Sequence, residues 1–114
     1  ASFTASRFDY KEYGEKAREI ITRRVEYYAK KYNYSFNKLA IRNQKSRWGS
    51  CSKKGNLNFN YRIIFLPAKL RDYVIFHELC HLTELNHSKN FWLLVAREFP
   101  EYKDLRNQLS EFRI

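Results

Sequence analysis

The histidines constrain this sequence more than any other residue type. Histidine occurs three times in the 114 residues, at His77, His81 and His87, all within an eleven-residue window. On an α-helix, side chains at positions i and i+4 lie on one face, one turn apart, so His77 and His81 can share one ion. Ordinary core histidines are the alternative, but three such residues this close together predict a metal site.

Residues 77–81 read His-Glu-Leu-Cys-His. On a helix this H-E-x-x-H pattern is a zinc signature, in which the two imidazoles hold the metal and Glu78 serves as general base. Three protein ligands leave the fourth tetrahedral position for a water, whose pKa zinc lowers towards about 7. Glu78 would accept the proton of that water. We therefore expect one catalytic zinc ion (Zn2+) per chain.

His87 is the expected third ligand, because a turn after the helix can bring it back to the metal. Asn86 is the residue best able to end that helix in a left-handed conformation. Glu84 is a rival ligand on the same helical stripe, although we favour it as an outer carboxylate partner of a bound imidazole. The histidine spacing equals that of metzincins, but Glu84 replaces their glycine and the chain has no methionine for a Met-turn, so a metzincin fold is not predicted.

The net charge of +10 is unevenly spread: residues 27–71 contain eleven Lys or Arg and no Asp or Glu. Such a one-signed segment attracts anionic partners, nucleic acid among them, or is only a solvated basic surface. No dedicated nucleic-acid motif accompanies it. No run approaches the roughly 18 apolar residues of a membrane span, so no membrane partner is expected. Cys51 and Cys80 do not form a disulfide framework, which favours a cytoplasmic setting.

The pattern along the chain predicts one α+β domain over residues 1–114. Residues 8–32 have the 3.6-residue period of an amphipathic helix, with Gly14 weakening its first part. A buried metal-binding helix follows Pro67 and extends to about residue 85. Ser88 caps the first of two C-terminal helices, which Pro100 separates.

Three strands are expected between the first helix and the metal-binding helix. Alternating apolar and polar residues place them at 38–43, 46–52 and 57–65. The sequence Lys53-Lys54-Gly55-Asn56 predicts a hairpin turn between the last two strands. The predicted architecture is therefore a small antiparallel sheet packed on the metal-binding helix.

Several blocks carry a resemblance to a known family: Arg47-Trp48-Gly49-Ser50-Cys51, residues 57–62, Tyr73-Val74, residues 77–82, and Asn86-His87-Ser88 with Phe91-Trp92. Over about residues 39–109 the chain resembles the YgjP-like metal-dependent hydrolases, which are related to the SprT and WLM zincins. Members are often longer, with a β-rich N-terminal half, and usually have alanine where this chain has Cys80.

The resemblance implies a zincin-like fold with zinc on His77, His81 and His87 and with Glu78 as base. It favours a zinc-dependent metallopeptidase acting on peptide or protein substrates. A nucleoside-triphosphate pyrophosphatase acting on UTP is the alternative, since that activity is also assigned within the family. A DNA-associated protease, recruited through the basic segment 27–71, and a non-catalytic zinc domain are further alternatives.

Residues beyond the zinc ligands are candidates for substrate contacts. The edge of the predicted strand 46–52 would align an extended peptide. Arg47 and Arg62 could instead clamp phosphates, since guanidinium groups match them. Trp48 is either a buried anchor or a surface for stacking a base. Tyr73, one turn before His77, is a candidate for stabilising the transition-state oxyanion.

Overall fold

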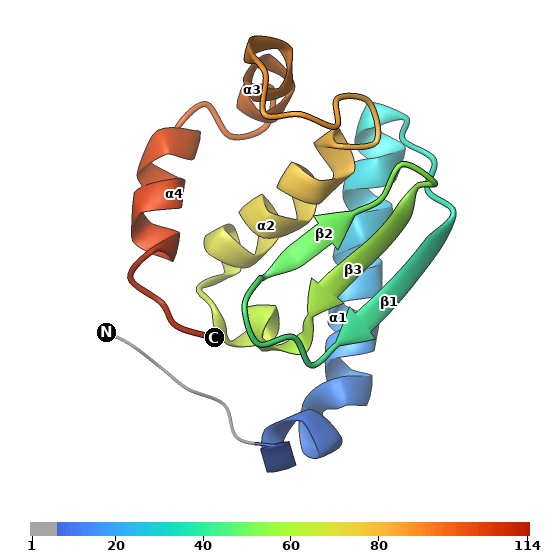
Figure 1. Cartoon of the computed structure of the whole chain (residues 1–114), viewed down its shortest axis with the longest axis vertical. Coiled ribbons are helices and arrows are strands. Elements are labelled where there is room, and N and C mark those ends of the chain that lie inside the picture. Colours follow the sequence, from blue (N-terminus) through green and yellow to red (C-terminus); the bar gives the residue numbers. More distant parts are fainter. Residues whose placement is uncertain (1–6) are drawn as a thin grey trace.

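The computed structural model describes residues 7–114. In chain order the elements are α1 (Arg7–Tyr32), β1 (Lys38–Arg42), β2 (Gly49–Cys51), β3 (Asn56–Asn60), the 3-10 helix η1 (Tyr61–Phe65), α2 (Ala68–Cys80), α3 (Lys89–Ala96) and α4 (Tyr102–Leu109) (Figure 1). The predicted α+β class, N-terminal helix and two C-terminal helices are confirmed. Helix α1 is continuous from Arg7, so Gly14 does not delay its start.

The three strands form a mixed sheet in the order β1-β3-β2. Strand β3 pairs antiparallel with β2 through the expected hairpin, in which Gly55 has φ 81°. However, β3 pairs parallel with β1, so the prediction of an antiparallel sheet is wrong for that pair. The turn residues determine only the hairpin between β2 and β3. The position of β3 between the other two strands depends on contacts between residues far apart in the sequence, which the turn residues do not determine.

Two strands are shorter than predicted. The strand predicted at 46–52 is limited to Gly49–Cys51, and the one predicted at 57–65 ends at Asn60 and continues as η1. The side chain of Asn60 accepts a hydrogen bond from the backbone N–H of Arg62 and so caps η1. In the apolar run at 63–66, Ile63 and Leu66 are buried, Ile64 is half-buried and Phe65 is exposed.

Helix ends also differ from the sequence prediction. Helix α2 ends at Cys80 rather than near residue 85, and a turn follows it. Among the described residues, Asn33 and not Asn86 is the non-glycine residue with positive φ, at 60°. Asn33 ends α1, where the N–H of Tyr34 donates to the carbonyl of Ala29 at 2.8 Å, as in a Schellman motif.

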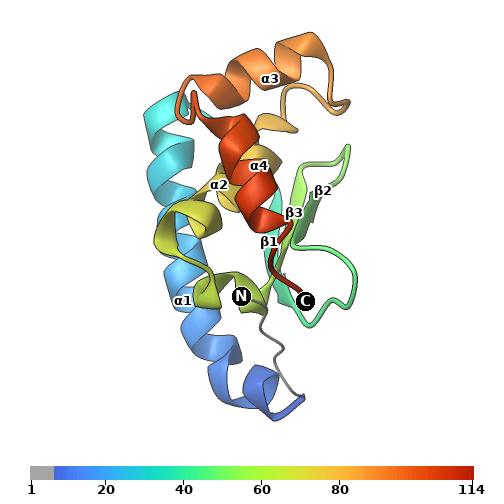
Figure 2. The ribbon, with the colours of Figure 1, turned by 90° about the vertical axis from the view of Figure 1, so that its left-hand side faces the viewer.

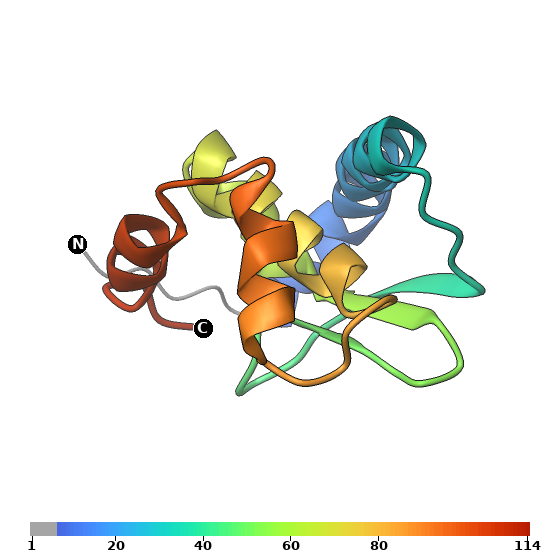
Figure 3. The ribbon, with the colours of Figure 1, turned by 90° about the horizontal axis from the view of Figure 1, so that it is seen from above.

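Helices α1 and α2 cover one face of the sheet, and α3 and α4 lie beyond α2 (Figures 2 and 3). Helix α2 contacts α1, β2, β3, η1, α3 and α4, which explains why it is apolar nearly all round. A partly buried polar link joins α1 to α2: Arg24 pairs with Asp72 at 2.8 Å, and the hydroxyl of Tyr28 donates to the same carboxylate at 3.0 Å. This link fixes α2 against α1.

Both cysteines are free, as expected: Cys80 is buried and Cys51 is half-buried. Within residues 7–114, none of the helices has the length and apolar character that crossing a membrane requires.

The environment of Gly14 yields a stability prediction. A Cβ at this helical position would come no closer than 3.8 Å to another atom, so Gly14→Ala should raise the free energy of unfolding by about 0.4–1 kcal/mol. Gly55→Ala is the matched control and should lower it, because alanine is strained at φ 81°. Urea unfolding of both variants checks this, and a less stable Gly14→Ala variant would contradict it.

Candidate metal centre

The three histidines converge on one point. The Nε2 atom of His87 lies 3.1 Å from Nε2 of His77 and 3.2 Å from Nε2 of His81, and a ligand atom of each ring lies within 4.8 Å of the others. Tetrahedral zinc with Zn–N distances of about 2.0–2.1 Å places its nitrogen ligands roughly 3.3 Å apart. The donor set and its spacing therefore fit a zinc ion.

The turn after α2 brings His87 back to this point. Residues 81–83 form the turn, and Ser88 begins α3 by accepting a hydrogen bond from the N–H of Phe91, as predicted. His87 is therefore fixed between two helix ends. His77 and His81 are one turn apart on α2, with His81 at its C-cap.

The outer partner of His81 differs from the one expected. Its Nδ1 lies 2.9 Å from the backbone carbonyl oxygen of Glu84, so an N–H at Nδ1 donates to that carbonyl and leaves the Nε2 lone pair for a metal. The Glu84 carboxylate instead accepts a hydrogen bond from the Ser88 hydroxyl at 3.2 Å. Glu84 therefore orients the ring through its backbone rather than through its carboxylate.

Burial favours the neutral form of His77 and His81 and makes the Glu78 carboxylate more basic. The pKa of His77 is lowered to about 3, first by burial and then by the neighbouring His81 and His87, and burial also lowers the pKa of His81. Neutral imidazole is the form that binds metal. Glu78 is 8% exposed, and burial raises its pKa to about 7 although the nearby Arg47 opposes the shift.

Aromatic rings from α3 hold the histidines in place. Phe91 stacks on His81 with ring centroids 4.3 Å apart, and Trp92 stacks on His87 at 5.7 Å. Trp92 in turn stacks on Tyr102 of α4 at 4.8 Å. From the sequence, Phe91 and Trp92 were part of the family resemblance and had no assigned role at the metal site. Their positions, four and five residues after His87, could have indicated that they lie near the histidine cluster.

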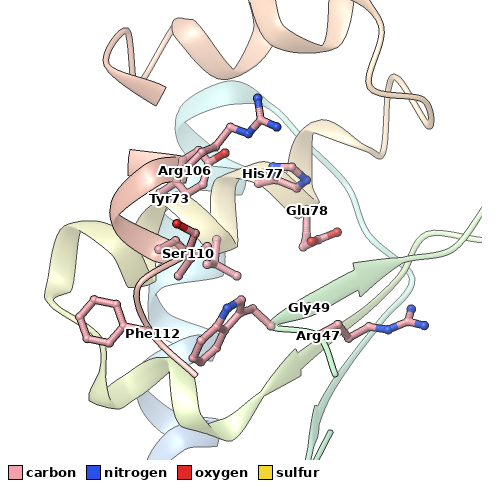
Figure 4. A pocket seen from close by; sticks show the side chains of 11 residues that line it. Arg47, Gly49, Tyr73, His77, Glu78, Arg106, Ser110 and Phe112 are labelled. Carbon is pink, nitrogen blue, oxygen red and sulfur yellow. The ribbon is translucent and has the colours of Figure 1, made fainter. Parts of the chain in front are cut away.

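A cavity of about 420 Å³ opens beside His77 and Glu78 (Figure 4). Tyr73, a sequence candidate, lies in its wall, and burial raises the pKa of its hydroxyl to about 12, so it remains protonated at neutral pH. Among the other candidates, Arg47 and half-buried Trp48 also line the cavity. Arg106 from α4, which the sequence analysis did not single out, lines it as well.

Arg62 is not among the residues lining the cavity. It is 2% exposed, and its guanidinium donates to the backbone carbonyl of Gln44 at 2.9 Å. The buried amide of Asn60 donates to the carbonyls of Gln44 and Arg47 at 2.9 and 3.1 Å. Arg62 and Asn60 therefore hold the loop 43–48, which carries Arg47 and Trp48 to the site, and the predicted phosphate clamp of Arg47 with Arg62 is not formed.

Strand β2 lies against α2 at Gly49. A Cβ at this position would lie 3.2 Å from Cγ of Glu78, 3.1 Å from the backbone oxygen of Asn58 and 3.1 Å from Cδ1 of Phe59. The absence of a side chain therefore allows β2 to lie directly beside Glu78. This explains the glycine within the Arg47–Cys51 block.

His77 and His81 of the H-E-x-x-H segment and His87 from beyond the following turn form a group that could hold a metal ion, next to Glu78 and strand β2. The family model for the YgjP-like metallopeptidase domain matches residues 7–112, and the chain belongs to this family. The match includes α1, so it is longer than the 39–109 expected from sequence.

Two solved structures share the fold. The metallopeptidase zymogen of abylysin from Pyrococcus abyssi has a TM-score of 0.71 and 23% identity, and the match covers 80% of this chain and 93% of that one. The metallopeptidase zymogen of jannalysin from Methanocaldococcus jannaschii has a TM-score of 0.62 and 22% identity, with coverage of 83% and 94%. Comparison with curated proteins gave no match.

The contact at Gly49 predicts the effect of adding one methyl group. Gly49→Ala should lower the free energy of unfolding by about 1–3 kcal/mol, because two of the three close atoms belong to the adjacent strand and the third to the buried Glu78. Urea unfolding measures the change, with Gly14→Ala as the control for an unhindered glycine. Unchanged stability of Gly49→Ala would show that β2 and α2 can separate freely.

Proposed function

We propose that this chain is a zinc-dependent peptidase in which His77, His81 and His87 hold one zinc ion and Glu78 is the general base. The observation that carries the proposal is the convergence of three imidazole Nε2 atoms next to a buried carboxylate, in a domain of a metallopeptidase family. We also propose a cytoplasmic setting, with which the two free thiols are compatible.

The residues around the metal site have distinct roles in the proposed reaction. A zinc ion held there would act as a Lewis acid, polarising the scissile carbonyl and lowering the pKa of the attacking water. Glu78 accepts a proton from the attacking water as the C–O bond forms, and passes it to the leaving amine as the C–N bond breaks. A buried carboxylate with a pKa of about 7 exchanges protons at neutral pH. The protonated hydroxyl of Tyr73 donates to the developing oxyanion.

Strand β2 is the proposed binding edge for the peptide substrate. Trp48 and Ser52, on either side of β2, make backbone hydrogen bonds to β3, so the alternate residues Gly49 and Cys51 direct their N–H and C=O groups to the open edge. An extended peptide can pair with these groups as an added strand. It would then pass Glu78, and a side chain next to the scissile bond would enter the 420 Å³ cavity.

Hydrolysis of a nucleoside triphosphate such as UTP is a second candidate function. The guanidinium groups of Arg47 and Arg106 at the cavity favour an anionic ligand. The burial of Arg62 removes one of the two arginines on which the sequence argument for this activity relied. Peptide hydrolysis is therefore the preferred proposal.

Zinc binding should depend on His87. We expect about one zinc per chain by metal analysis, and His87→Ala should weaken zinc binding by more than the about 10–100-fold that loss of an outer partner causes. Glu84→Gln is the matched control and should leave affinity nearly unchanged, because His81 contacts the backbone carbonyl of residue 84 rather than its carboxylate. A large loss in Glu84→Gln would instead identify Glu84 as a ligand.

Glu78→Gln should abolish hydrolysis while zinc remains bound. Removing a general base of this kind lowers kcat by roughly 100- to 10,000-fold. The assay compares casein and UTP side by side, with and without a chelator, and uses Glu84→Gln as the active control. Casein cleavage by the wild type that is lost in Glu78→Gln would support the peptidase proposal. Chelator-sensitive hydrolysis of UTP alone would favour the nucleotide reaction, and full activity of Glu78→Gln would remove Glu78 from the mechanism.

A further inference from the structure

No described helix covers the outer face of the sheet. Figure 3 shows all the helices on the other side of the sheet. On β1, Ile41 faces the core, so Lys38 and Arg42 face outward. On β3, Leu57 and Phe59 face the core, so Asn56 and Asn58 face outward beside β1.

Five exposed cations surround this surface, which we call the basic sheet face: Lys38 and Arg42 on β1, Lys45 in the loop 43–48, and Lys53 and Lys54 in the hairpin turn. None of the five forms an ion pair with any other described residue. Three other cations of the segment 27–71 are neutralised: Lys31 by Glu98, Lys69 by Glu101 and Arg71 by Asp72. Acidic residues from the helices therefore neutralise cations away from the sheet and leave the charge of the basic sheet face uncompensated.

The cations form two groups at opposite ends of the strands. Lys38 lies beside the hairpin turn with Lys53 and Lys54, because Asn37 donates a backbone hydrogen bond to Gly55. Arg42, at the other end of β1, lies next to the loop that carries Lys45. At about 3.3 Å per residue, Lys38 and Arg42 are roughly 13 Å apart. This spacing is close to the about 12 Å width of the DNA major groove, which a row of phosphates borders on each side.

The remaining outward side chains indicate what the partner is. Ala40, Ser50, Asn56 and Asn58 are small or carry amides, and no aromatic ring occupies an outward strand position, so the face offers nothing on which unpaired bases could stack. The exposed large apolar side chains lie elsewhere, at Tyr27, Phe65, Leu85 and Leu93, so the face has no group to insert into a lipid surface. Cations and amide donors together match phosphate oxygens.

We propose that the basic sheet face binds the phosphate backbone of duplex nucleic acid, without sequence preference. The histidine cluster and the cavity lie on the helix side of the sheet, so bound nucleic acid leaves them accessible. Binding itself does not depend on the proposed peptidase activity.

Fluorescence anisotropy with a short labelled DNA duplex tests the proposal on the full chain. The sheet-face variant replaces all five cations with glutamine: Lys38→Gln, Arg42→Gln, Lys45→Gln, Lys53→Gln and Lys54→Gln. The control variant removes the same charge from exposed lysines outside the sheet: Lys11→Gln, Lys16→Gln, Lys30→Gln, Lys89→Gln and Lys103→Gln. Thermal unfolding followed by circular dichroism verifies that both variants fold.

We expect duplex binding by the wild type that weakens steeply with salt. The salt dependence should become shallower by about 0.9 for each phosphate that the sheet-face variant no longer neutralises. Its affinity at low salt should fall at least about 100-fold, and that of the control variant by much less. Equal reductions in both variants would overturn the proposal, as would absent duplex binding, or preference for single strands or for vesicles containing phosphatidylserine. Glu78→Gln should bind DNA like the wild type, so failure of the peptidase proposal is recognised separately in the casein assay.

Discussion

Burial of helix α2 is the constraint on which the site depends. The helix is packed among α1, the sheet, η1 and the two C-terminal helices, so its histidines and Glu78 occupy fixed positions with little solvent around them. Charged groups are costly in such surroundings, and the protein responds by keeping His77 neutral and by raising the pKa of Glu78 to about 7. The same packing that stabilises the domain therefore holds His77 in the neutral form that can bind a metal and gives the Glu78 carboxyl its raised pKa.

Features that depend on local spacing were predictable from the sequence. The helical period of H-E-x-x-H placed His77 and His81 one turn apart, and the short connection to His87 allowed it to return to them, as the Nε2 distances show. Ser88 as an N-cap and Gly55 in the hairpin turn were also correct, because each satisfies a backbone requirement within its own few residues. The resemblance to the YgjP-like family added the expectation of a zincin-like fold.

Features that depend on distant partners were not predictable in this way. No local pattern shows that β3 inserts between β1 and β2 or that the side-chain amide of Asn60 donates to the carbonyls of Gln44 and Arg47. The guanidinium group of Arg62 is of the kind that binds anionic ligands. In the fold, however, Arg62 is buried and donates to the carbonyl of Gln44. The contact of His81 with a backbone carbonyl at residue 84 was missed for a related reason, since main-chain groups are identical at every position and give no sequence signal.

The buried amide of Asn60 shapes the site before any substrate arrives. Its N–H groups join the carbonyls of Gln44 and Arg47, and its oxygen accepts from the N–H of Arg62, so one side chain fastens both ends of a loop segment to the end of the sheet. These hydrogen bonds restrict the conformations of the loop 43–48 before a ligand binds, which lowers the entropy cost of binding. The wall formed by Arg47 and Trp48 is therefore preorganised, so that residues 7–114, with a three-stranded sheet, can present a rigid cleft.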